Sequence, residues 1–167
     1  MGLWYPKGGQ FDLIGYSDSE WVGDRVDRKF TSSTCHFLGR SPECWASKKH
    51  NYVLISTAEA EYIATRSCCT QILLLKQMLK DYGIHVKKIP LLCDTKSAIK
   101  IAHNLVQHSR TKHIDIRHHF LQDHVQREDI VISHVRTEDQ LADIFTKPLD
   151  EKIFCALRCE SRNIQSD

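Results

Sequence analysis

The sequence lacks several features that would assign it quickly to a class of protein. Its 7 cysteines include no C-x-x-C pair, so a zinc site is not indicated. No apolar run approaches the roughly 18 to 20 residues of a membrane-spanning helix, and no signal peptide opens the chain. The cysteine count is odd, and Cys35, Cys44 and Cys93 lie in strand-like apolar runs. We therefore expect buried free thiols in a soluble protein of a reducing compartment.

The charge of the chain is too nearly balanced to identify a partner. Its 167 residues carry a net charge of +2, and 41% of them are hydrophobic, which is typical of one globular domain. Acidic residues are absent from Thr95 to Ile114, where basic side chains alternate with histidines. Such a stripe can follow the phosphates of a nucleic acid. The alternative is a solvated helix face and loop, which is slightly favoured when the stripe is taken alone.

Apolar patterning predicts an α/β fold. Strands are expected over Phe11–Asp18, Phe30–Leu38 and Cys44–Lys49, with Ser41-Pro42 as a break, and their short connections suggest an antiparallel meander. A capping box at Ser56 and Glu59 begins a long helix, which Gly83 ends.

The second half of the chain alternates between strands and helices. The elements expected there are a strand over Ile89–Cys93, helices over Thr95–His103 and Arg110–Gln126, a strand over Ile130–Val135, and a last helix capped by Thr137 and Gln140. This order predicts a mixed sheet with helices packed on it. Residues 1–10 are expected to be a lead-in segment, residues 11–149 the domain, and residues 150–167 a polar, partly disordered C-terminal tail.

Four short acidic motifs lie along the chain in an order that suits a metal-dependent nuclease. They are Gly15-Tyr16-Ser17-Asp18, Ser56-Thr57-Ala58-Glu59-Ala60-Glu61-Tyr62, Leu91-Leu92-Cys93-Asp94 and Gln140-Leu141-Ala142-Asp143. Two place an aspartate at the end of a predicted strand, and two place a carboxylate in the first turns of a predicted helix. Converging carboxylates repel one another unless a hard cation neutralises them, and oxygen ligands suit Mg²⁺ or Mn²⁺.

Two glutamates compete for the second position in this set. Glu59 can complete the capping box with Ser56, so a structural role explains it. Glu61 lies about 200° around the helix from Glu59 at 3.6 residues per turn, and it caps nothing. We therefore choose Glu61 and keep Glu59 as the alternative.

Longer blocks of sequence extend these motifs into a family resemblance. The blocks are GYSDSEWVGD, KFTSSTCHFLG, WASKKH, STAEAEYIA, LLCDTKSAIKIA, HSRTKHIDIRHHF and HVRTEDQLADIFTKPL, in that order along most of the chain. With them the chain resembles the ribonuclease H domain of Ty1/copia-type retrotransposon polyproteins, particularly those of plants. The resemblance implies a ribonuclease H-like mixed five-stranded sheet, with three antiparallel strands followed by parallel additions and flanking helices.

The resemblance also implies an activity and its residues. The activity is hydrolysis of the RNA strand of RNA–DNA hybrids during reverse transcription. The catalytic, metal-binding carboxylates carry over to Asp18, Glu61, Asp94 and Asp143, which would hold two Mg²⁺ ions, with Mn²⁺ as a substitute. Residues expected to contact nucleic-acid phosphates are Lys48, Lys49, Lys96, Arg110 and Lys112. His134 lies where some ribonucleases H have a histidine that assists product release, but a structural role is favoured.

Partners and alternatives follow from the same resemblance. A full polyprotein would add reverse transcriptase and integrase regions, and the expected setting is the cytoplasm, within a virus-like particle, with the nucleus as an alternative; no membrane is involved. Lys96 departs from the family pattern by placing a positive charge beside Asp94. The competing hypotheses are a non-catalytic nucleic-acid-binding remnant and another nuclease of the same fold, against which the copia-type blocks argue.

Overall fold

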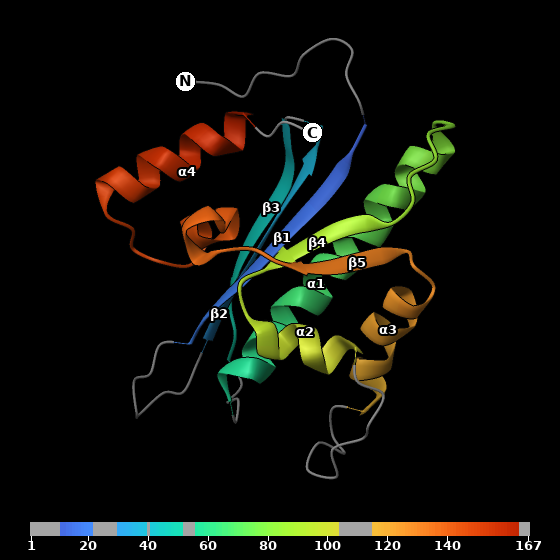
Figure 1. The fold of residues 1–167 in the computed structure, drawn as a ribbon, viewed down its shortest axis with the longest axis horizontal. Coiled ribbons are helices and arrows are strands. Elements are labelled where there is room, and N and C mark those ends of the chain that lie inside the picture. Colours follow the sequence, from blue (N-terminus) through green and yellow to red (C-terminus); the bar gives the residue numbers. More distant parts are fainter. Residues whose placement is uncertain (1–10, 22–29, 40, 52–55, 104–114, 164–167) are drawn as a thin grey trace.

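A five-stranded mixed sheet forms the centre of the molecule (Figure 1). The computed structural model describes residues 11–21, 30–39, 41–51, 56–103 and 115–163. The strand order is β3-β2-β1-β4-β5. Strand β1 pairs antiparallel with β2, and β2 antiparallel with β3, whereas β4 and β5 add on in parallel. The predicted fold class, three antiparallel strands followed by parallel additions, is confirmed.

The bounds of the strands are close to those predicted. Strands β2 (Phe30–Leu38) and β4 (Ile89–Cys93) span the predicted residues, and β5 (Ile130–His134) stops one residue early. The strand β1 (Leu13–Trp21) starts later than expected and runs past Asp18. The strand β3 (Ser41–Lys49) includes the predicted break.

Pro42 lies inside β3 because of where that strand stands. Strand β3 is at the edge of the sheet, beside β2 alone. Pro42 pairs with Phe37, next to an irregularity in the β2–β3 register. Edge strands and bulges tolerate proline, since no ladder hydrogen bond is lost there. The prediction of a break at Ser41-Pro42 was therefore wrong.

The long helix α1 (Thr57–Asp81) covers one face of β1 and β2. The Ser56 hydroxyl accepts a hydrogen bond from the Glu59 amide at 3.2 Å, which confirms the predicted N-cap. At the other end Gly83 has φ +79°, and the amide of Ile84 bonds back to the Leu79 carbonyl at 2.9 Å. This is a Schellman motif, and it confirms Gly83 as the stop.

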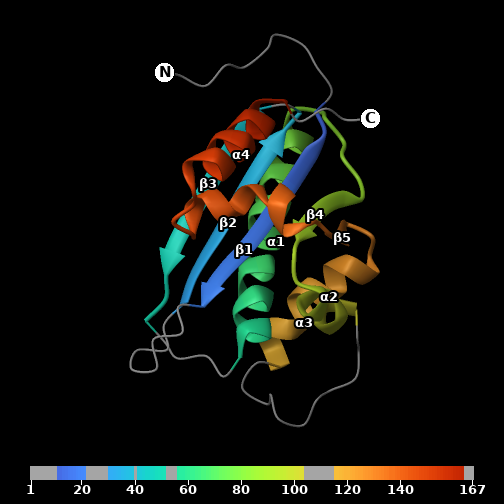
Figure 2. The ribbon, with the colours of Figure 1, turned by 60° about the vertical axis from the view of Figure 1, so that its left-hand side comes forward.

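Two shorter helices lie on the same side of the sheet as α1 (Figure 2). They are α2 (Lys96–His103) and α3 (Asp115–Gln126). Residues 110–114 of the predicted third helix fall outside the described residues. Among the described residues, no helix is both long enough and apolar enough to cross a bilayer.

The opposite face is covered by the C-terminal part of the chain, and here the predictions need two corrections (Figure 1). The expected single helix from Thr137 is two 3-10 turns, η1 (Thr137–Asp139) and η2 (Leu141–Phe145), because Gln140 between them has extended backbone angles. The expected polar tail contains a helix, α4 (Glu151–Asn163). Its Leu157 is 1% exposed and joins the core formed with η2.

All 7 cysteines are free thiols. Cys35, Cys68, Cys69 and Cys93 are buried, Cys44 and Cys155 are half-buried, and Cys159 is exposed. The expectation of buried free thiols is thus confirmed for Cys35 and Cys93, while Cys44 is more open than expected.

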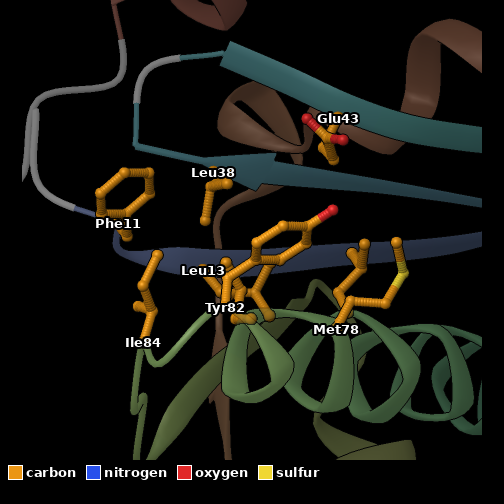
Figure 3. Close-up of a pocket in the computed structure, with 9 residues that line it drawn as sticks. Phe11, Leu13, Leu38, Glu43, Met78, Tyr82 and Ile84 are labelled. Atoms are coloured by element: carbon orange, nitrogen blue, oxygen red, sulfur yellow. The ribbon is translucent and has the colours of Figure 1, made fainter. Parts of the chain in front are cut away.

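An apolar groove lies at the C-terminal end of α1 (Figure 3). It is lined from the sheet side by Phe11, Leu13 and Leu38, and from the helix side by Met78, Tyr82 and Ile84. Glu61 lies near the other end of α1, roughly 27 Å away along the helix axis at 1.5 Å per residue. The groove is therefore separate from the acidic residues described next.

Candidate active site

Sheet register brings Asp18 and Asp94 to the same level. Tyr16 of β1 pairs with Leu92 of β4, so the residue two places beyond each partner is Asp18 and Asp94 respectively. Neighbouring strands lie roughly 4.8 Å apart. The prediction that Asp18 ends β1 was wrong, because β1 continues to Trp21 beside β2, and β3 accompanies β2 as far as Lys49. Asp18 lies instead at the point where β1 continues beyond the end of β4.

Helix α1 adds a third carboxylate to this pair. One ligand atom each from Asp18, Glu61 and Asp94 lies within 4.8 Å of the others. Asp18 and Glu61 are buried and Asp94 is half-buried. The structure therefore brings Glu61, and not Glu59, into the cluster.

Glu61 is held by the strand that it approaches. Its Oε1 accepts hydrogen bonds from the Ser19 hydroxyl at 2.8 Å and from the Ser19 amide at 3.2 Å. Thr65, one turn along α1, donates to the Glu61 carbonyl at 2.8 Å and meets the Ser17 hydroxyl at 3.2 Å. These contacts fix the first turns of α1 against β1.

The other oxygen of Glu61 has the properties expected of a metal ligand. Glu61 Oε2 is buried and has no hydrogen-bond partner among the residues that the structure describes. Burial, together with the neighbouring charge of Asp18, raises the pKa of Glu61 to about 8. A buried carboxylate oxygen without a donor is costly unless a proton or a metal ion neutralises it. The three carboxylates thus fit a hard divalent cation by the chemistry of their donor atoms.

Asp94 follows β4 and is oriented by two threonines. The Thr95 hydroxyl donates to Asp94 Oδ1 at 3.2 Å, and the Thr137 hydroxyl donates to Oδ2 at 3.4 Å. The predicted role of Thr137 as a helix cap is wrong, since η1 has no side-chain cap at Arg136.

Asp143, the fourth predicted carboxylate, lies on η2 and is connected to the site through Lys147. It is not part of the three-carboxylate cluster. The Lys147 ammonium joins it to Asp18, with Nζ 2.9 Å from Asp143 Oδ1 and 3.2 Å from Asp18 Oδ1. Burial and the charge of Asp18 raise the pKa of Asp143 to about 6, although Lys147 opposes this rise.

Lys147 and Thr146 are contacts that the sequence interpretation missed. The Thr146 hydroxyl donates to Asp18 Oδ2 at 2.5 Å, so both oxygens of Asp18 have partners in the FTKPL block. Burial lowers the pKa of Lys147, but its bonds to Asp143 and Asp18 outweigh this effect and raise it. The signal available in the sequence was a lysine four residues after Asp143, one helical turn away.

Buried polar side chains anchor η2 to the sheet. The Ser33 hydroxyl of β2 donates to the Ala142 carbonyl at 2.8 Å. The Gln140 amide, which is 0% exposed, donates to the Ser17 carbonyl at 2.9 Å and accepts from the Ala142 amide at 3.3 Å. These bonds set where Asp143 stands relative to Asp18.

Three of the five residues predicted to contact phosphates are described, and all three are exposed. Lys48 and Lys49 end β3, just beyond the Asp18–Ser33–Ser47 row of the sheet, roughly 10 Å across two strands from Asp18. Lys96 begins α2, two residues after Asp94. Arg110 and Lys112 lie outside the described residues. His134 is exposed at the end of β5, where it pairs with Cys93.

Known proteins that resemble most of the chain in sequence include polyproteins of plant transposons. The retrovirus-related Pol polyprotein from transposon RE1 of Arabidopsis thaliana is 38% identical over 154 residues, or 92% of this chain and 10% of that polyprotein. The one from transposon TNT 1-94 of Nicotiana tabacum is 34% identical over 85% of this chain and 11% of its own length. The chain thus spans about a tenth of the length of these relatives. No model of a known protein family matches it.

Solved structures that resemble the chain are ribonucleases H. The N-terminal RNase H domain of rv2228c from Mycobacterium tuberculosis matches 91% of this chain and 99% of its own, with a TM-score of 0.60 and 10% identity. LC11-RNase H1, isolated from compost and solved in complex with an RNA/DNA hybrid, matches 81% of this chain and 94% of its own, with a TM-score of 0.56 and 16% identity. The chain therefore belongs with the retrovirus-related Pol polyproteins of plant Ty1/copia-type transposons, as the homologue of one segment of them, and it has the ribonuclease H fold.

Proposed function

We propose that the chain hydrolyses the RNA strand of RNA–DNA hybrids, as part of the reverse transcription of a retrotransposon. The observation that carries the proposal is the convergence of Asp18, Glu61 and Asp94 around the unpartnered, buried Glu61 Oε2. The ribonuclease H fold and the homology to Pol polyproteins support the same activity.

Divalent cations, Mg²⁺ or Mn²⁺, are the proposed cofactors. Asp18, Glu61 and Asp94 would hold one ion, and Asp18 with Asp143 would hold a second. Bound in this way, such ions lower the pKa of a bound water and offset the negative charge that develops on the phosphate and on the leaving oxygen. The chain supplies four carboxylates to hold them and uses no side-chain nucleophile.

The protein groups around the carboxylates have defined tasks in this proposal. Ser19 leaves only Oε2 of Glu61 open to a ligand, because it binds the other oxygen twice. The two threonines beside Asp94 restrict its rotation. Orientation by fixed hydrogen bonds keeps metal ligands in place before substrate arrives.

Exposed lysines at the same end of the sheet are the proposed substrate contacts. Lys48 and Lys49 on one side of Asp18, and Lys96 on the other, would bind phosphates of the two strands. Selection of a hybrid over duplex DNA would rest on contacts to 2′-hydroxyl groups in the minor groove. Arg110 and Lys112 remain predicted contacts. A reverse transcriptase region in the same polyprotein is the proposed partner, in the cytoplasm.

Cleavage of a labelled RNA strand paired to DNA tests the proposal. We expect cleavage by the wild type in Mg²⁺ or Mn²⁺, none in EDTA, and loss of cleavage in Asp18→Asn. Asp123→Asn, which removes an exposed carboxylate on α3, is the matched control and should cut like the wild type. If the folded wild type binds the hybrid but never cuts it, the alternative of a non-catalytic nucleic-acid-binding remnant becomes the better account.

A further inference from the structure

A lysine ammonium lies between two of the carboxylates that the proposed function assigns to metal ions. Lys147 Nζ is 3.2 Å from Asp18 Oδ1 and 2.9 Å from Asp143 Oδ1. The two aspartate side chains are 1% and 5% exposed, whereas the lysine side chain is 28% exposed. The cation thus closes the solvent side of a buried pair of like charges.

Asp18 divides the site into two halves. On one side it joins Glu61 and Asp94, neither of which has an ion pair with a lysine or arginine among the described residues, and Glu61 Oε2 has no hydrogen-bond partner there. On the other side it faces Asp143, and there the charge is already offset by Lys147. A divalent ion placed within a few ångströms of an ammonium is repelled by it. The two halves therefore differ in their capacity to take up an ion.

Lys147 is not needed to hold η2 in place. The Ser33–Ala142 bond, at 2.8 Å, ties η2 to β2. The Gln140 amide ties the same segment to β1, and the Thr146 hydroxyl bonds Asp18 directly. None of these contacts involves the Lys147 ammonium, so they remain available to position Asp143 when it moves. An amine on a flexible four-carbon stem, partly open to solvent, can leave without unfolding the segment.

We propose that Lys147 is a tethered cation that occupies the Asp18–Asp143 half of the site. The chain by itself then takes up one divalent ion, at Asp18, Glu61 and Asp94, and a second only after Lys147 has left. This inference rests on the proposed function, since it assumes that the acidic site serves divalent ions. It goes further by naming the residue that controls how many ions are bound.

Counting bound Mn²⁺ tests the inference without any measurement of cleavage. Mn²⁺ is titrated into the metal-free full chain, without nucleic acid, and the free ion is followed by electron paramagnetic resonance. We expect the wild type to saturate at one ion and Lys147→Gln at two. Lys152→Gln, which removes the same charge from an exposed position on α4, should saturate at one.

Two results would overturn the inference: a wild type that saturates at two ions, or a folded Lys147→Gln that saturates at one. Circular dichroism establishes whether each variant is folded. If Lys147→Gln does not fold, the wild-type titration decides, because one ion supports the inference and two ions reject it. Cleavage of the hybrid is assayed separately on the same preparations. If the wild type cuts the hybrid but binds two ions in the absence of nucleic acid, the proposed function stands and the inference about Lys147 fails. If the wild type never cuts but binds one ion, the inference stands and the proposed function fails.

Discussion

Removal of metal is expected to make the stability of the folded chain fall as pH rises. The reason is Glu61, whose pKa is raised to about 8 by burial and by the charge of Asp18. The folded state therefore holds a proton that the unfolded chain, with a pKa of 4.5, has released. Stability provided by this proton is complete below pH 4.5 and is lost as pH rises through 8.

Other groups limit the window in which this effect can be seen alone. Burial lowers the pKa of His36 and of His50 below 6.5. The folded state therefore binds these protons less readily than the unfolded chain does, and the free energy of unfolding decreases as pH falls through 6.5. Asp143, with a pKa of about 6, completes most of its ionisation below the window. The buried thiols have pKa values raised above 9, as for Cys69 at about 12, and act only at higher pH. Between pH 6.5 and 8 Glu61 is the group that lowers stability most strongly, and the two histidines oppose it at the lower end of this range.

The size of the effect follows from linkage. One proton held only by the folded state lowers the free energy of unfolding by about 1.4 kcal/mol for each pH unit. Over the window this amounts to about 2 kcal/mol at most. For a chain of this length a change of 1 kcal/mol moves Tm by roughly 2 to 4 °C. The expected fall in Tm in EDTA is therefore at most about 4 to 8 °C.

Thermal unfolding followed by circular dichroism measures this fall. In Mg²⁺ the fall should disappear, because a bound cation replaces the proton, so the stabilisation by Mg²⁺ grows with pH. Glu61→Gln has no carboxyl to ionise at this position and is the matched control, whose Tm in EDTA should not fall as pH rises. A wild-type Tm that stays constant or rises from pH 6.5 to 8 without metal would refute the reasoning. So would a Glu61→Gln variant that falls as steeply as the wild type.

Three further predictions concern the packing that positions the site, and each is measured as a free energy of unfolding in urea. Gly15→Ala should cost about 1 to 3 kcal/mol, since the new Cβ would stand 2.6 Å from Ile72 Cδ1 and 2.8 Å from Cys68 Sγ; an unchanged midpoint would mean that α1 is not packed this closely on β1. Ser56→Ala should cost about 1 kcal/mol through the lost bond to the Glu59 amide, whereas Ser56→Asp, which keeps an acceptor, should cost little. Gln140→Leu should cost about 1 to 3 kcal/mol for each buried backbone group that it leaves without a partner; no loss of stability would show that Gln140 does not anchor η2.

Local pattern in the sequence determined most of the sheet and the first helix. Strand β2 and strand β4 have the predicted bounds, because alternating or continuous apolar residues between turn signals report local burial. The choice of Glu61 over Glu59 also followed from local geometry, since Glu59 is at the capping-box position and Glu61 lies about 200° further around the helix, and the structure confirms it. Both inferences depend only on residues that lie within a few positions of each other in the sequence.

Only the tertiary structure decided how the C-terminal part meets the site. The polar residues of 150–167 gave no strong signal of a helix, yet α4 forms because Leu157 is buried against the η2 side of the sheet. A helical pattern was expected through Asp143, but the buried bonds of Gln140 to the Ser17 carbonyl and the Ala142 amide favour short 3-10 turns. In both places the free energy of burial outweighed local propensity.

The sequence by itself determined which carboxylates the chain carries and that several of them end up near one another. It did not determine that Lys147 stands between Asp18 and Asp143, residues from opposite ends of the domain. That contact depends on the order of the strands and on the depth at which η2 packs against β1 and β2. Periodicity encodes which face of an element is buried, whereas the partner that a buried charge finds is set by long-range packing and by the cost of leaving that charge without a counter-ion.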